Sequence, residues 1–266
     1  MTNAETNYVI ESLARGLVVL KAFGPGNPEM SLADIAETAE VSKATGLRMA
    51  RTLCEHGFLI KIDANKRYRV GPAAISVGLA TVASMTLPSI AEPFLAHLRD
   101  VTGETVQLAV PDGDDVVIVG RTPSRQFPPN TIYIGHRVPI HAGSLGRAML
   151  STLDTDRLSA LLDRIDINGA TSRSRTTKRE ITASVTEAAR RGWALNDQET
   201  TLEHRSLAAP LRAPSGRAVG ALNITVSAQR LSARELARKH AMTVVGIARE
   251  VTALLPDTFA GRQYVA

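Results

Sequence analysis

The stretch from Val41 to Gly71, VSKATGLRMARTLCEHGFLIKIDANKRYRVG, constrains the fold of this chain more than any other. A helix is predicted to begin after Ser42, because its hydroxyl can accept a hydrogen bond from an unpaired amide of the first turn. A glycine follows the helical pattern, and then come two short strand patterns joined at Ala64-Asn65. The stretch therefore predicts a helix followed by a two-stranded wing.

The predicted helix has an apolar face and a basic face. Positions i, i+3, i+4 and i+7 share one side of a helix. Here these inward-facing positions are Gly46, Met49, Ala50 and Leu53, and the opposite side holds Ala44, Leu47, Arg48 and Arg51. Residues 41–70 contain seven Lys or Arg and two acids, a net charge of +5, whereas residues 1–40 have a net charge of −4. Positive charge is therefore concentrated on this unit.

The segment before this stretch predicts two more helices. Residues 10–23 have apolar side chains at helical spacing, which predicts a helix, and Gly24-Pro25-Gly26 ends this helix. Ser31 then precedes LADIAETA, with Asp34 three residues later as in a capping box. A three-residue connection, Glu40 to Ser42, leads into the basic helix. This order is that of a winged helix-turn-helix, a DNA-binding motif; the alternative is a helical hairpin that packs on another domain.

A further helix is expected from Pro72, since proline is tolerated at a first helical position. Ile75, Leu79 and Val82 recur on one of its faces. The pattern fits a connecting helix that pairs with its copy in a second chain, and it fits an ordinary core helix of the next domain equally well.

The remainder of the chain alternates between helical and strand patterns. Pro111-Asp112-Gly113-Asp114 is an explicit hairpin turn signal, and Thr177 and Ser232 begin capping boxes. The predicted helices are 89–103, 143–153, 155–164, 177–191 and 232–255, and the predicted strands are 104–110, 115–121, 131–140, 193–198, 206–212 and 218–226. We predict an α+β fold with helices on an antiparallel sheet. The expected divisions are a winged helix-turn-helix domain at 1–71, a linker helix at 72–86 and an effector-binding domain at 87–266.

Composition excludes several classes of protein. The 266 residues are 44% apolar, enough for two cores, and no apolar run reaches the ~18 residues of a membrane span. The N-terminus lacks the basic and then apolar segments of a signal peptide. The single cysteine, Cys54, fits a reducing compartment and a buried structural role. We therefore expect a cytoplasmic protein without membrane contact, metal or cofactor. The net charge of +5 fits nucleic-acid binding, although many enzymes are as basic.

Six segments in this order resemble the IclR family of transcriptional regulators. They are SLARGLVVLKAF at 12–23, SLADIAETAEVSKAT at 31–45, RYRVGP at 67–72, IHAGSLGRAML at 140–150, RGWALNDQE at 191–199 and LNITVSAQRLS at 222–232. The resemblance implies an N-terminal winged helix-turn-helix and a linker helix that contributes to dimerisation. It also implies a GAF-like C-terminal domain that binds a small carboxylic acid, in a homodimer or a tetramer built from dimers.

Within the family, the chain resembles most the branch that controls protocatechuate and p-hydroxybenzoate catabolism. The opening helix, DGDDVVIVGR at 112–121 and LNITVSAQRLS show this likeness. Two departures matter. That branch usually has CTSMGR where this chain has AGSLGR at 142–147, and Gly46-Leu47 replaces a larger apolar residue followed often by Arg or Tyr. The effector of that branch is therefore not carried over to this chain, and the operator sequence is expected to differ from those of close relatives.

The DNA-binding prediction assigns different contacts to different side chains. Arg48 and Arg51 are placed for base edges or phosphates, since an arginine fork can engage guanine O6 and N7 together. Leu47 could touch a thymine methyl group. The full set of predicted operator contacts is Ser42, Lys43, Ala44, Thr45, Leu47, Arg48 and Arg51 on the helix, and Lys66 and Arg67 on the wing. For each arginine, a solvated or phosphate-bound charge is the alternative.

The resemblance also implies an effector pocket in the C-terminal domain. Carried over by position, its residues are Ser144, Leu145, Gly146, Asn196, His204, Ser206, Asn223 and Thr225. The pattern supports two of these. Asn223 and Thr225 are two apart on one strand, so they face one side, and polar groups in an apolar run need a partner. A ligand carboxylate would provide one, as would neighbouring backbone.

Three other functions are weighed against this one. An acyl hydrolase could use Ser144, His141 and an acid such as Asp197, but GSLG lacks the glycines of a nucleophile elbow. A metal site from His136, His141 and His204 lacks tight ligand spacing. A ligand-sensing scaffold whose winged domain binds protein would lack salt-dependent binding to duplex DNA. We predict a regulator whose effector shifts the spacing of two recognition helices and hence operator affinity.

Overall fold

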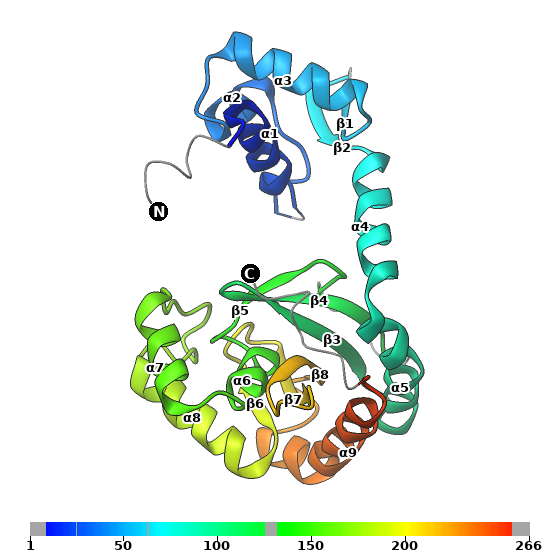
Figure 1. Ribbon diagram of the computed structural model, residues 1–266, viewed down its shortest axis with the longest axis vertical. Coiled ribbons are helices and arrows are strands. Elements are labelled where there is room, and N and C mark those ends of the chain that lie inside the picture. Colours follow the sequence, from blue (N-terminus) through cyan, green and yellow to red (C-terminus); the bar gives the residue numbers. More distant parts are fainter. Residues whose placement is uncertain (1–8, 25, 63, 126–131, 257–266) are drawn as a thin grey trace. The chain divides into compact units, whose positions relative to one another are not determined.

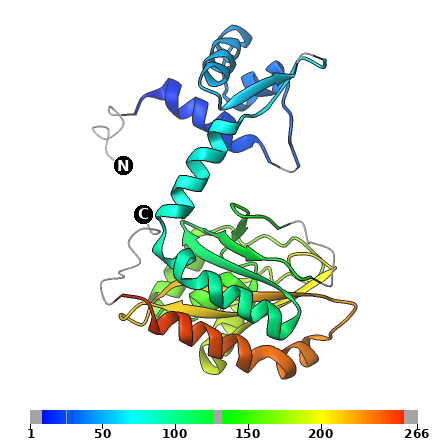
Figure 2. The same ribbon diagram turned by 90° about the vertical axis from the view of Figure 1, so that its right-hand side faces the viewer.

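The chain folds into two compact units, residues 1–84 and 85–266, as seen in a computed structural model (Figures 1 and 2). The structure describes residues 9–24, 26–62, 64–125 and 132–256. The first unit contains α1 (Glu11–Ala22), α2 (Leu32–Thr38), α3 (Lys43–Glu55), β1 (Leu59–Ile62), β2 (Arg67–Val70) and α4 (Pro72–Ser84). The second contains α5 (Thr86–Thr102), β3 (Thr105–Asp112), β4 (Asp115–Thr122), β5 (Arg137–Pro139), α6 (Ser144–Leu150), α7 (Thr155–Arg164), α8 (Lys178–Arg191), β6 (Ala194–Asp197), β7 (His204–Arg212), β8 (Ala218–Ser227) and α9 (Ala233–Ala253).

The first unit has the predicted winged helix-turn-helix order, and its helix starts are capped as expected. The Ser31 hydroxyl accepts from the Asp34 amide at 3.2 Å, and the Asp34 carboxylate accepts from the Ser31 amide at 2.7 Å. The Ser42 hydroxyl accepts from the Thr45 amide at 3.3 Å, so α3 begins where the sequence indicated. Gly46 and Ala50 face inward and are buried.

The wing is held to the helices by a short bridge on the outer edge of β2. Strands β1 and β2 are antiparallel, with Ile62 opposite Arg67 next to the turn. On the other edge, the Tyr68 amide donates to the Met30 carbonyl at 2.7 Å, and the Met30 amide donates back at 2.9 Å. Both side chains are buried with Leu59 in the core of this unit. The wing is thus fixed to the segment just before α2.

The second unit is a six-stranded antiparallel sheet in the order β5-β4-β3-β8-β7-β6, with helices on both faces. Alternate residues of each strand face opposite sides, so Leu108 and Leu222 pack toward α5 and α9, whereas Ala109 and Ala221 pack toward α6, α7 and α8. Figure 1 shows α6, α7 and α8 on one side of the sheet, and Figure 2 shows α5 and α9 along the other. The predicted α+β architecture is confirmed.

The strand predicted at 131–140 is wrong for most of its length. Thr131 lies outside the described residues, and only Arg137–Pro139 forms a strand. Before it, Gly135 adopts a left-handed conformation with φ 92°, which turns the backbone. This segment still contacts β4, because the Gly135 amide donates to the Ile118 carbonyl at 2.7 Å. The segment with the alternating apolar pattern is therefore an irregular segment at the edge of the sheet instead of a regular strand.

Two helix boundaries differ from prediction by three residues. Helix α5 begins at Thr86, so Pro88 is inside its first turn, where a proline costs no intrahelical hydrogen bond. Helix α6 ends at Leu150 instead of residue 153. There the hydroxyls of Ser151 and Thr152 donate to the carbonyls of Ala148 and Met149 at 2.7 and 2.8 Å, which satisfies the last turn.

Helix α4 is apolar, yet none of its described side chains is buried. Ile75, Val77 and Leu79 are 64%, 56% and 64% exposed. It is therefore not a core helix of this chain. Across the described ranges, no single helix is long and apolar enough to span a membrane; α4 and α5 pass such a test only when they are counted together.

Candidate functional site

The basic face predicted for the helix after Ser42 is the exposed face of α3. Lys43, Arg48 and Arg51 are exposed, and within the described ranges none of them forms an ion pair. Ala44 and Thr45 are exposed beside them, whereas Leu47 is half-buried. Unpaired cations on one helix face can exchange solvent for phosphate or base contacts without first breaking an internal salt bridge.

Ser42 and Thr45 have a structural task in addition to the predicted DNA contact. The Ser42 hydroxyl accepts from the Thr45 amide, and the two hydroxyl oxygens are 3.0 Å apart. The pair therefore orders the first turn of α3, the end of a recognition helix that commonly approaches bases.

The two cations predicted at the wing tip have different surroundings. Lys66 is exposed in the turn, with φ 55°. Arg67 is half-buried: its Nη2 donates to the Glu29 carbonyl at 2.7 Å and to the Asp34 carboxylate at 3.5 Å. Arg67 therefore ties the wing to the N-terminus of α2. This differs from the free wing-tip cation that the sequence suggested, and its contact with DNA stays a prediction.

Gly46, one of the two unusual residues of the recognition helix, lies where α3 crosses α2. A Cβ atom at this position would lie 3.0 Å from the Ala36 Cβ and 3.2 Å from the Ala36 Cα. Real Cβ atoms seldom approach other carbon atoms so closely, and a backbone atom such as Cα cannot rotate away. Glycine thus permits the close contact between the two helices, which accounts for a residue that is otherwise unfavourable within a helix.

A cavity of about 240 Å³ opens on the α6 face of the sheet in the second unit. All the predicted effector residues line it except Gly146. A Cβ atom at Gly146 would lie 1.9 Å from the Ile140 carbonyl oxygen, so this glycine lets α6 pack directly on that backbone. Its role as an effector contact is not supported by its position, whereas Ser144 and Leu145 on the same turn do face the cavity.

Strand pairing explains how polar residues far apart in sequence meet in this cavity. Thr225 of β8 is opposite Ser206 of β7, which is opposite Asn196 of β6. One row further, Gln107 of β3 is opposite Asn223 of β8. All five side chains are on the same face of the sheet, because residues in register on neighbouring strands point the same way.

The hydrogen bonds within the cavity leave two buried atoms unpaired. The hydroxyls of Ser144 and Ser206 are 2.7 Å apart, and the Thr225 hydroxyl donates to the Gln107 side-chain oxygen at 3.4 Å. Among the described residues, Gln107 Nε2 and Asn223 Oδ1 have no hydrogen-bond partner. Since an unpaired buried polar atom costs about 1–3 kcal/mol, a ligand or water that hydrogen-bonds to these two atoms would be favoured here.

Sequence reasoning missed about half of the cavity lining. The missed residues are Gln107, Val116, Ile118, Ile132, His136, Val138, Thr200 and Thr201. The valines and isoleucines make one end apolar, opposite the polar rows. Burial lowers the pKa of His136, and it lowers the pKa of His204 against the attraction of Glu203. Both imidazoles are therefore neutral at pH 7.

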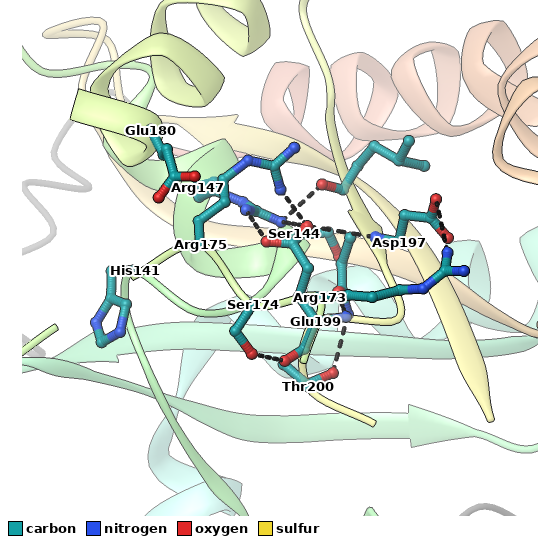
Figure 3. Close-up of polar contacts among 12 residues, drawn as sticks. His141, Ser144, Arg147, Arg173, Ser174, Arg175, Glu180, Asp197, Glu199 and Thr200 are labelled. Carbon is teal, nitrogen blue, oxygen red and sulfur yellow. Dashed lines mark hydrogen bonds and ion pairs between the residues drawn. The ribbon is translucent and has the colours of Figure 1, made fainter. Parts of the chain in front are cut away.

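The loop after β6 is fixed behind the cavity by a buried ion-pair cluster (Figure 3). The Glu199 carboxylate accepts from Arg147 at 2.7 and 2.8 Å and also from Arg175. The Glu199 amide donates to the Asn196 side chain at 2.9 Å, which orients this cavity residue. Burial alone would raise the pKa of Glu199, but the hydrogen bonds and charges of Arg147 and Arg175 outweigh it and lower the pKa.

The structure does not assemble the hydrolase triad weighed above. Ser144 shares a hydrogen bond with Ser206, whereas His141 Nε2 lies 3.3 Å from the Asn168 carbonyl. Figure 3 shows His141 well apart from Ser144. Asp197 pairs with Arg205 at 2.5 Å. Over the described part of the chain, there is also no group of three or more His, Cys, Asp or Glu side chains that could hold a metal.

Comparison with known families agrees with this geometry. Residues 12–61 match the IclR helix-turn-helix domain, and residues 79–253 match the family described as bacterial transcriptional regulator IclR C-terminal. The chain belongs to the IclR family. Members of this family are transcriptional regulators that bind DNA through the helix-turn-helix domain and an effector in the C-terminal domain.

Individual relatives cover nearly the whole of this IclR-family chain. It is 28% identical to the Pca regulon regulatory protein of Pseudomonas putida, over 90% of this chain and 82% of the relative. It is 28% identical to the acetate operon repressor of Salmonella typhimurium, over 94% and 92%. An IclR homologue from Microbacterium hydrocarbonoxydans, solved in complex with 4-hydroxybenzoate, has the same fold, with a TM-score of 0.73 at 21% identity, over 91% of this chain and 96% of that one.

Proposed function

We propose that this regulator responds to a small organic acid with an apolar body, bound in the cavity between α6 and the sheet. The observation that carries this proposal is that two cavity-lining residues, Gln107 and Asn223, have buried side-chain atoms, Nε2 and Oδ1, without a described hydrogen-bond partner. A carboxylate would accept from Gln107, and a ligand hydroxyl or a bridging water would donate to Asn223.

The shape of the lining supports an aromatic or similarly compact acid. Val116, Ile118, Ile132 and Val138 would contact the apolar body, while the serine hydroxyls would hydrogen-bond the head group. The described part of the lining contains no lysine or arginine, so neutral donors would hold the anion. A relative named for the Pca regulon and a homologue crystallised with 4-hydroxybenzoate lend this acid class further support.

Calorimetric titration with 4-hydroxybenzoate, benzoate and succinate tests this proposal. We expect at least one aromatic acid to bind, and Gln107→Ala to weaken binding about tenfold, because a hydrogen bond to a charged group contributes about 1.5–3 kcal/mol. Gln229→Ala is the matched control, since Gln229 is exposed in the same domain. Failure of every acid to bind the wild-type protein, or equal loss in both variants, contradicts the proposal.

We further infer that the protein acts as a dimer through its exposed apolar helices. Leu13 and Leu17 on α1 and Ile75 and Leu79 on α4 are each about half or more exposed. Effector binding would then favour one arrangement of two recognition helices and so change operator affinity. Operator-binding titrations at increasing concentrations of the acid found by calorimetry measure this coupling, and an unchanged operator affinity at saturation contradicts it.

A further inference from the structure

A second hollow in the C-terminal domain shares no lining residue with the effector cavity. It has a volume of about 350 Å³ and lies between the end of α8, strand β7 and the second half of α9. Its described lining includes four arginines, Arg190, Arg191, Arg212 and Arg249, and no carboxylate among residues 9–24, 26–62, 64–125 and 132–256. Four cations from three elements therefore border one concave surface.

The acids nearby balance only part of this charge. Glu187 pairs with Arg190 at 2.9 Å and with Arg191 at 3.7 Å. The Arg212 side chain donates to the Gly216 carbonyl at 2.9 Å, and neither Arg212 nor Arg249 forms an ion pair with any described residue. In the part of the chain that the structure describes, one carboxylate thus pairs with two of the four guanidinium groups, which leaves the hollow positively charged.

Two of these arginines are also partly removed from water. Burial lowers the pKa of Arg212, and burial outweighs the attraction of Glu187 in lowering the pKa of Arg191, with repulsion from Arg147 adding to it. Partial burial of a cation without a full countercharge is unfavourable unless an anion compensates it. The Thr252 hydroxyl, which accepts from the Arg212 amide at 3.2 Å, keeps its own hydrogen for an acceptor in the hollow.

We propose that this hollow, which we call the arginine groove, binds a small anion with two or more phosphate or carboxylate groups. Guanidinium groups bind such anions through paired N–H donors of matching geometry. A multivalent anion would engage several of the four side chains at once, whereas a monocarboxylate would neutralise only one. The arginine groove is therefore a second ligand site, separate from the effector cavity in position and in charge.

The single tryptophan of the chain gives a direct readout. Trp193 lies under the Arg191 guanidinium, 3.6 Å from the ring centroid. The test is a titration of the full-length protein with pyrophosphate and with citrate, followed by tryptophan fluorescence. Sodium chloride at matched ionic strength is the control. At least one multivalent anion is expected to give a saturable change. Pyrophosphate alone would identify a phosphorylated ligand, and citrate alone a polycarboxylate.

Variants separate the arginine groove from general charge effects. Arg249→Gln and Arg212→Gln are each expected to weaken anion binding about tenfold. Arg157→Gln removes the same charge from α7, outside the groove, and should leave affinity unchanged. Saturable change with neither anion, or equal affinity in both groove variants and the wild type, overturns the proposal. So does displacement of the bound anion by 4-hydroxybenzoate, because it would place the anion in the effector cavity.

Discussion

Arg147 and Glu199 form a two-point ion pair inside the C-terminal domain, with nitrogen–oxygen distances of 2.7 and 2.8 Å. The two side chains are 0% and 4% exposed. Arg147 extends from α6, whose first turn lines the effector cavity. Glu199 extends from the loop after β6, and its amide donates a hydrogen bond to the side chain of the cavity residue Asn196. The pair therefore joins two walls of the cavity.

Arg147→Met is predicted to lower the free energy of unfolding by about 3–5 kcal/mol, because it leaves the Glu199 charge buried without its main partner. Urea denaturation of the C-terminal transition measures this change. Arg190→Met is the control: Arg190 forms a solvent-exposed ion pair with Glu187, and such pairs contribute little to stability. Equal losses of unfolding free energy in the two variants would show that the buried pair stabilises the domain no more than an exposed pair does.

The same pair predicts a dependence of stability on pH. Its hydrogen bonds lower the pKa of Glu199 in the native state despite burial. The unfolded chain therefore takes up this proton at a higher pH than the native one. The stabilisation is complete above the ordinary glutamate pKa of about 4.3 and is lost as pH falls through the lowered native value. Acid denaturation followed by circular dichroism should show this component in the wild type and lack it in Glu199→Gln.

Gly46→Ala is predicted not to stabilise the DNA-binding domain, although alanine favours a helix by about 1 kcal/mol over glycine. The added methyl group would lie 3.0 Å from the Ala36 Cβ and would push α3 away from α2. Gly16→Ala in α1 is the matched control. Apart from its chain neighbours and the backbone of α1 itself, no described atom lies within 4 Å of a Cβ placed there, so this variant should gain about 1 kcal/mol in thermal unfolding experiments.

A second substitution distinguishes contact from propensity. Ala36→Gly removes the Cβ that the Gly46→Ala methyl group meets, so the double variant should be more stable than the sum of the two single effects predicts. Purely additive effects of the two substitutions would mean that the helices do not meet at these residues.

Local signals in the sequence predicted much of this fold correctly. Capping boxes at Ser31, Thr177 and Ser232 marked helix starts that the structure confirms, because a cap depends only on residues three apart. The Asp-Gly turn at residues 112–113 gave the β3–β4 hairpin for the same reason. Each of these features is determined by a few neighbouring residues.

Features that depend on strand register could not be read in the same way. Gln107 faces the cavity only because β3 pairs with β8 and places it opposite Asn223. Arg147 and Glu199 are 52 positions apart, and neither stands out in a sequence with many charges. The strand predicted at 131–140 failed because alternation of side chains does not report a backbone turn at Gly135.

Arg48→Ala is predicted to reduce operator affinity without reducing stability, because Arg48 is exposed and forms no described ion pair. Loss of a base-reading contact costs about 1–3 kcal/mol and relaxes sequence preference. Footprinting on the native operator checks this. Arg67→Ala is the informative comparison: it should lower domain stability, because it breaks the contacts with Glu29 and Asp34. Unchanged affinity and sequence preference in Arg48→Ala would refute the assignment.

Leu79→Lys is predicted to shift the protein from dimer to monomer. Leu79 is 64% exposed on a helix that buries none of its described side chains, so apolar pairing with a second copy is the stabilising contact open to it. A charge at this position would have to be desolvated on pairing. Light scattering coupled to size-exclusion chromatography measures the mass. Val101→Lys, at an exposed apolar position of α5, is the matched control and should keep the wild-type mass.

Operator affinity should fall together with the dimer in Leu79→Lys, since two half-sites are then no longer bound by one particle. A Leu79→Lys protein of unchanged mass would remove α4 from the dimer contact.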